Sequence, residues 1–122
     1  MIMEYLKLCD SDYRFMQVVW EYAPIPSGEL VKRCDEELGW KKSTTYTVIK
    51  RLSQRGVLKN ENAIVTSLVS KDEVQKEESR KFIEKNFNGS LPSFIASFIS
   101  SKALSYEEIA EIRTLIDKFE EK

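Results

Sequence analysis

Residues 39–58 read GWKKSTTYTVIKRLSQRGVL, and this stretch decides the fold. Together with Lys59 it holds six of the 19 Lys and Arg residues of the chain, while residues 39–58 contain no Asp or Glu. The whole chain of 122 residues has a net charge of −1, so the stretch is basic within a mildly acidic protein. Such a window is either a solvated helix face that is cationic by chance or a surface that meets a polyanion.

The apolar residues of this stretch have the spacing of an amphipathic helix. We predict that the helix begins near Ser43 and is stopped by Gly56. Its inward face follows the spacing i, i+3, i+4, i+7 and consists of Thr45, Val48, Ile49 and Leu52. The outward face carries hydroxyls, amides and cations but no acid, and consists of Ser43, Tyr46, Thr47, Lys50 and Gln54, with Thr44, Arg51 and Arg55 on its flank.

Two more helices are predicted ahead of this basic helix. Residues 10–23 begin with acids and have one apolar face, which consists of Met16, Val19, Trp20 and Ala23. The prolines of the following segment PIPSG, residues 24–28, break this helix. Ser27 is a suitable N-cap for a second helix, which Gly39 ends. The apolar face of this second helix consists of Leu30, Val31, Cys34 and Leu38.

The basic helix is followed by two short stretches with β propensity, VLKN at 57–60 and AIVTSLV from residue 63. Asn60, Glu61 and Asn62 lie between them, so we predict a hairpin with a tight turn there. Three helices followed by a hairpin are the layout of a winged helix. The predicted fold is therefore mainly α, with a winged helix-turn-helix domain at residues 1–70.

Residues 71–122 differ in composition and are predicted to be a separate helical domain. Ser70 with Glu73, and Ser105 with Glu108, have the spacing of capping boxes at two helix starts. The helices carry apolar faces that they are too few to bury as a bundle, so we expect two chains to bury them against each other. The alternative is that the helices fold back on the N-terminal half. The predicted dimerisation residues are Leu91, Phe94, Ile95, Phe98, Ile99, Ile109, Ile112 and Ile116.

The outward face of the basic helix has what a helix in the DNA major groove needs. Hydroxyls and donors reach base edges and phosphates, cations replace counterions, and no carboxylate repels the backbone. Its position as the third helix before a hairpin favours DNA binding further. An alternative is a winged-helix module that binds an acidic protein and does not read DNA. The predicted DNA-binding residues are Lys41, Lys42, Ser43, Thr44, Tyr46, Thr47, Lys50, Arg51 and Arg55.

Several classes of protein are disfavoured by the composition. The chain has no histidine, which removes the usual general base near neutral pH and the commonest zinc ligand. Cys9 and Cys34 do not form a metal motif, and Cys34 lies on an apolar face where a buried thiol is expected. We therefore expect no enzyme, metal or cofactor. No apolar run approaches the roughly 18–20 residues of a membrane span, and without a secretory signal the expected location is the cytoplasm.

The chain resembles the penicillinase-repressor family of the BlaI and MecI type, from about Leu8 to Lys118. The resemblance lies in MQVVW at 16–20, in Trp40 followed by TTYTVIKRLSQRGVL at 44–58, and in LSYEEIAEIRTLI at 104–116. It implies a homodimeric repressor that binds a pseudo-palindromic operator in double-stranded DNA through the N-terminal domain. It further implies that a membrane sensor protease relieves repression through a cut in the C-terminal domain, which weakens the dimer.

This sequence departs from the family pattern at several positions. The bond that matches the family's Asn-Phe cleavage site is Ser97–Phe98. Tyr46 occupies a base-reading position that is Arg in well-studied members, and tyrosine either donates one hydrogen bond or touches a thymine methyl. Glu61 stands in the predicted hairpin turn, so weak wing contacts to phosphate are expected. Residues 71–122 contain no cysteine, which argues against the metal sensing of a copper-responsive branch.

Overall fold

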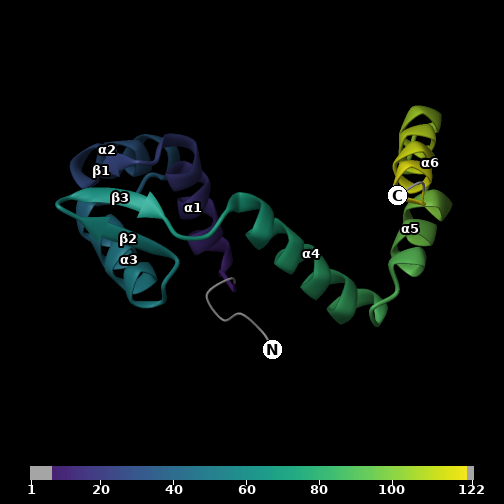
Figure 1. Cartoon of the computed structure of the whole chain (residues 1–122), viewed down its shortest axis with the longest axis horizontal. Helices are drawn as coiled ribbons and strands as arrows, with labels where there is room; N and C mark the ends of the chain where they lie inside the picture. Colours follow the sequence, from purple (N-terminus) through teal and green to yellow (C-terminus); the bar gives the residue numbers. More distant parts are fainter. Residues whose placement is uncertain (1–6, 121–122) are drawn as a thin grey trace. The chain divides into compact units, whose positions relative to one another are not determined.

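A computed structural model describes residues 7–120 of the chain. The chain forms two compact units, Met1–Ser79 and Arg80–Lys122. The first unit contains three helices, a small sheet and the start of the helix that follows the sheet, which can be traced in Figure 1. Its helices are α1 (Asp10–Tyr22), α2 (Ser27–Leu38) and α3 (Lys42–Gln54), which confirms the three helices expected from the sequence within a residue or two at each end.

The second helix ends as predicted but begins differently. Gly39 follows α2 with a φ of 71°, and its N–H donates to the Asp35 carbonyl at 3.0 Å. This left-handed conformation costs glycine little, which explains the stop. Ser27, however, is the first residue of α2 and not its N-cap, which is Pro26. The Ser27 N–H donates to the Ala63 carbonyl at 2.8 Å, so the helix start is tied to the hairpin turn.

The sheet has three antiparallel strands in the order β1-β3-β2. They are β1 (Ile25–Pro26), β2 (Leu58–Glu61) and β3 (Ile64–Ser67). The turn between β2 and β3 consists of Asn62 and Ala63, which both have positive φ, as a two-residue hairpin turn with matching twist requires. The predicted turn at residues 60–62 was therefore too early, and Glu61 belongs to a strand. The sequence analysis also missed β1, whose Pro26 is tolerated because β1 is an edge strand.

The core of the first unit lies between the three helices and the sheet. Its centre is fully buried and includes Phe15, Met16, Val19, Leu30, Cys34, Leu52, Val57, Val65 and Val74. The predicted inward face of α3 is confirmed, since Thr45, Val48, Ile49 and Leu52 are all buried. Trp20 fastens α1 to the hairpin, because its Nε1–H donates at 3.1 Å to both the Ser67 hydroxyl and the Val69 carbonyl.

Three more helices follow the sheet, α4 (Lys71–Phe87), α5 (Leu91–Ser100) and α6 (Tyr106–Glu120). The first half of α4 belongs to the first unit and supplies Val74 to its core. Both predicted capping boxes are present. The Glu73 and Glu108 N–H groups donate to the Ser70 and Ser105 hydroxyls at 3.0 and 3.1 Å, and each glutamate accepts the serine N–H in return. An aromatic cluster joins the end of α4 to α5, with ring centroids 4.8–6.1 Å apart, and consists of Phe82, Phe87, Phe94 and Phe98.

Candidate nucleic-acid interface

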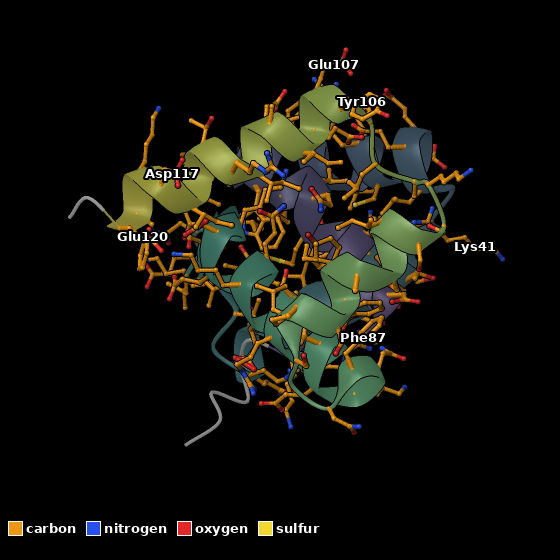
Figure 2. The ribbon with its side chains drawn as sticks, turned by 90° about the vertical axis from the view of Figure 1, so that its right-hand side faces the viewer. Lys41, Phe87, Tyr106, Glu107, Asp117 and Glu120 are labelled. Carbon is orange, nitrogen blue, oxygen red and sulfur yellow. The ribbon has the colours of Figure 1, made fainter. Side chains whose placement is uncertain are left out.

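The outer face of α3 is exposed and free of acids. Lys41 precedes the helix and projects into solvent, as Figure 2 shows. The residues that share the exposed surface with it are Lys42, Ser43, Thr44, Tyr46, Thr47 and Lys50. No ion pair involves Lys41, Lys42 or Lys50 in the part of the chain that the structure describes. These three lysines therefore offer their full charge to a polyanion.

A hollow lies beside the first half of this face. It is open to solvent, has a volume of about 440 Å3, and is lined by Ser11, Trp40, Ser43, Thr44, Thr47, Val48 and Arg51. The hydroxyls in this lining come from both α1 and α3, and Arg51 is its cation. The ring of Trp40 is held in place by Phe15, onto which it stacks with centroids 5.7 Å apart. Polar groups and one cation thus converge where α1 meets α3.

Two of the predicted DNA-binding cations are held by an acid in α1. Arg51 donates a hydrogen bond from Nη2 to Oδ1 of Asp12. Arg55 places Nη1 3.8 Å from Oδ2 of the same carboxylate, and its Nη2 donates to the Lys7 carbonyl. The Asp12 side chain is only 3% exposed. The carboxylate cancels one of the two positive charges, so this corner adds a single net charge to the basic surface.

Asp12 is a part of the site that was not predicted from the sequence, where the acids at the start of α1 indicate only a helix start. The helical spacing does indicate that Asp12 is buried. It lies three and four positions before the buried Phe15 and Met16, on the face of α1 that packs inward. A buried carboxylate needs a partner, and the exposed cations of α3 supply it.

The hydroxyls at the centre of the α3 face are engaged within the protein. The Tyr46 hydroxyl donates to the Ser27 hydroxyl over 3.4 Å, and Tyr46 is 37% exposed. The Thr47 hydroxyl donates to the Ser43 carbonyl, one helical turn earlier, over 2.9 Å. Thr45, on the inner face, likewise donates to the Lys41 carbonyl at 3.3 Å. Ser27 is a second residue that the sequence analysis left out of the site.

The hairpin adds little charge to this surface. Lys59 on β2 pairs with Glu61 on the same strand, with Nζ and Oε2 3.7 Å apart. Both side chains are largely exposed, so the pair contributes little to stability, but it leaves the strand electrically neutral. The turn residues Asn62 and Ala63 carry no charge. The basic surface is therefore centred on α3.

A buried thiol lies behind α3. Burial raises the pKa of Cys34 to about 11, and a hydrogen bond with the Thr45 side chain opposes that rise. Cys34 is fully buried in α2, as the sequence predicted, whereas Cys9 is exposed and its sulfur lies 3.4 Å from the Ser11 hydroxyl. Among the described residues no group of His, Cys, Asp and Glu is arranged to hold a metal ion.

The predicted dimerisation residues remain largely uncovered. Among the described residues of α5 and α6 none is buried. Leu91, Phe98, Ile99 and Ile116 are between 40% and 55% exposed. The half-buried members are Phe94, Ile95, Ile109 and Ile112. Phe119, which continues the apolar repeat of Ile109, Ile112 and Ile116, is 79% exposed. Tyr106 and Leu115 of α6, which were not predicted from the sequence, are 90% and 67% exposed.

The bond between Ser97 and Phe98 lies inside α5. The Ser97 hydroxyl donates to the Phe94 carbonyl at 2.7 Å, and the Ser97 carbonyl accepts the Ser101 N–H at 3.2 Å. Both residues are exposed.

In residues 7–120 no helix is long and apolar enough to cross a membrane.

The sequence model of the penicillinase repressor family matches residues 8–118. The chain is 26% identical to the methicillin resistance regulatory protein MecI of Staphylococcus aureus strain Mu50, over 92% of this chain and 94% of that protein. It is 24% identical to the penicillinase repressor of Bacillus licheniformis, over 92% and 91%. A solution structure of monomeric Bacillus licheniformis BlaI in complex with the blaP half-operator has a TM-score of 0.48 and 22% identity, over 55% of this chain and 87% of that one.

Proposed function

The chain belongs to the penicillinase repressor family, which consists of transcriptional regulators and not of enzymes, and we propose that it represses transcription as a homodimer on a pseudo-palindromic operator. In this proposal residues 1–70 bind double-stranded DNA, and residues 71–122 hold two copies together. Two identical domains related by a two-fold axis match the symmetry of two half-sites, spaced by one or two turns of about 34 Å.

The exposed face of α3 carries the proposal. It presents Lys41, Lys42 and Lys50 together with four hydroxyl-bearing residues, and no carboxylate interrupts it. The acids of the chain lie elsewhere, so the charge that meets a phosphate backbone is positive although the net charge of the protein is −1. The diameter of an α-helix fits the width of the major groove, so α3 can present this face to base edges and phosphates.

The exposed apolar faces of α5 and α6 support the dimer. The last two turns of α6 expose Leu115, Ile116 and Phe119, and α5 exposes Phe98 and Ile99. Contiguous exposed apolar surface marks an interaction site, and most soluble oligomers are symmetric assemblies of identical chains. Association also explains why two weak half-site contacts suffice for an operator, because the second contact becomes intramolecular.

Relief of repression is proposed to act on the Ser97–Phe98 bond through a membrane sensor protease system. A cut there divides α5, so the faces that hold the two copies together no longer form one surface. Each DNA-binding half then loses the gain from being tethered to its partner. Intact-mass spectrometry of the protein from cells treated with a β-lactam tests this step. A fragment ending at Ser97 supports it, and an uncut chain under conditions that induce the regulated genes refutes it.

The test of the main proposal is a selection of bound duplexes from a random library with the purified full chain, at about 0.15 M salt. A two-fold symmetric motif is expected. The control replaces Lys41, Lys42 and Lys50 with glutamine, which should abolish the enrichment while the protein stays folded. A folded, dimeric protein that enriches no motif contradicts the proposal and favours the alternative, a winged-helix module that binds an acidic protein.

A further inference from the structure

Tyr46 and Thr47, at the centre of the α3 face, both donate their hydroxyl hydrogen bonds to other groups of the protein. Tyr46 donates to the Ser27 hydroxyl and Thr47 donates to the Ser43 carbonyl, over 3.4 and 2.9 Å. A hydroxyl has one proton, so in this arrangement neither group directs a donor away from the protein. What each offers to the outside is an apolar surface, the ring of Tyr46 and the methyl group of Thr47.

Ser27 is in a fixed position to receive the Tyr46 hydroxyl. It is 6% exposed, and its backbone N–H is bound to the Ala63 carbonyl at 2.8 Å. Ser27 begins α2 and Tyr46 lies in the second turn of α3, so the contact joins the two helices of the helix-turn-helix. The phenol hydroxyl is thereby directed toward α2, and 37% of the residue remains exposed.

Because each base presents different groups in the major groove, this arrangement of Tyr46 and Thr47 should favour some bases over others. Guanine presents two acceptors there, adenine an acceptor and a donor, and thymine a carbonyl oxygen and a methyl group. Two side chains whose hydroxyl protons are directed into the protein gain nothing from the guanine acceptors, whereas an aromatic ring and a methyl group both pack well against the thymine methyl. We propose that Tyr46 and Thr47 read thymine methyl groups, so that each half-site carries A·T pairs beneath them. This inference rests on the proposed function.

The first test removes the methyl group from the DNA. In the selected operator each thymine of the half-site is replaced in turn by deoxyuridine, which lacks only that methyl. We expect the affinity of the full-length dimer to fall roughly four-fold for each methyl that Tyr46 or Thr47 contacts. Thymines that α3 does not contact serve as the control, and their replacement by deoxyuridine should leave the affinity unchanged.

The second test removes the hydroxyl or the apolar group from the protein. Tyr46→Phe and Thr47→Val delete a hydroxyl and keep the apolar contact, so both should bind within about two-fold of the original protein. Tyr46→Ala and Thr47→Ser delete the apolar contact, so both should bind more weakly and lose their response to deoxyuridine. Thermal unfolding of all four variants verifies that each is folded.

The outcomes separate this inference from the function it rests on. If the library yields no motif, the proposed function fails and this inference falls with it. If a motif is found but Tyr46→Phe loses ten-fold or more in affinity, the phenol hydroxyl reads a base and the inference is overturned while the repressor stands. A deoxyuridine effect that persists in both Tyr46→Ala and Thr47→Ser also overturns it, because other residues then read the methyl groups.

Discussion

The buried carboxylate of Asp12 in α1 accepts a hydrogen bond from Arg51, a residue on the helix that carries the basic face. Arg55 approaches the other oxygen of the same carboxylate at 3.8 Å. The acid thus connects α1 to the C-terminal half of α3, and it holds two cations that the sequence alone assigned to DNA. Their positions relative to the groove depend on a residue that a DNA duplex need not touch.

Replacing Asp12 with asparagine should destabilise the fold by about 1–2 kcal/mol. Asparagine fits the same space but cannot balance the two guanidinium groups. The loss is expected to stay below that of a fully buried pair, because the Arg51 side chain is 47% exposed and water solvates it. Urea denaturation measures the effect. Asp10→Asn is the matched control, since Asp10 is exposed in the same helical turn, and an equal loss for both variants would show that Asp12 acts only as a helix-start acid.

Neutralising the three lysines of the α3 face should reduce the salt dependence of DNA binding. With Lys41, Lys42 and Lys50 changed to glutamine, the slope of log K against log salt should become shallower by about 0.9 for every phosphate contact removed. The control neutralises Lys85, Lys102 and Lys118, which lie outside the first unit, and should leave the slope unchanged. Fluorescence anisotropy titrations at several salt concentrations give both slopes, and equal slopes would show that the α3 lysines do not contact phosphates.

A charge on the exposed face of α6 should weaken the dimer. Ile116→Asp places a carboxylate in the proposed interface, and we expect the dimer dissociation constant to rise at least roughly 100-fold. Ile116 is a better choice than Phe98, because the Phe98 ring also contacts the Phe94 ring within the chain, with centroids 4.8 Å apart, and its replacement would disturb that contact as well as the dimer. Thr114→Asp adds the same charge on the opposite side of α6 and should have little effect. Sedimentation equilibrium distinguishes the variants, and a dimer undisturbed by Ile116→Asp rules out this face.

Alkaline pH should destabilise the protein through Cys34. Burial holds the pKa of the thiol at about 11, above the value of about 8.5 expected in the unfolded chain. The folded state therefore favours the neutral thiol, and this contribution is fully present below about pH 8.5 and is lost as the pH rises toward 11. Urea denaturation between pH 8 and 11 measures it. Cys34→Ala should show a smaller decline than the original protein, and identical declines would show that Cys34 does not titrate with unfolding.

The sequence predicted the features that depend on neighbouring residues. The inward face of α3 follows from helical spacing, and the capping boxes of Ser70 and Ser105 follow from a fixed separation of three residues. The hairpin was found but its turn was misplaced by one residue, because Asn60 and Glu61 resemble turn residues although they pair with Val65 and Ile64.

What the sequence did not reveal depends on contacts between distant segments. Asp12 lies 39 residues from Arg51, and Tyr46 lies 19 residues from Ser27. Residue types alone do not tell which cation of a basic face is bound by a buried acid, or which hydroxyl is already engaged. The two-residue strand β1 has no periodicity that could be detected and exists because β3 offers it a partner.

The chain has two tryptophans, and their different positions make intrinsic fluorescence a probe of two separate parts of the protein. Trp40 lines the hollow beside the exposed face of α3, while Trp20 is bound to the hairpin through Ser67 and Val69. Indole emission depends on its surroundings, so a duplex that covers the hollow changes the emission of Trp40 and leaves that of Trp20 nearly constant. A Trp20→Phe protein would therefore report occupancy of the α3 face without an attached dye, and a Trp40→Phe protein would report whether the hairpin has come away from α1.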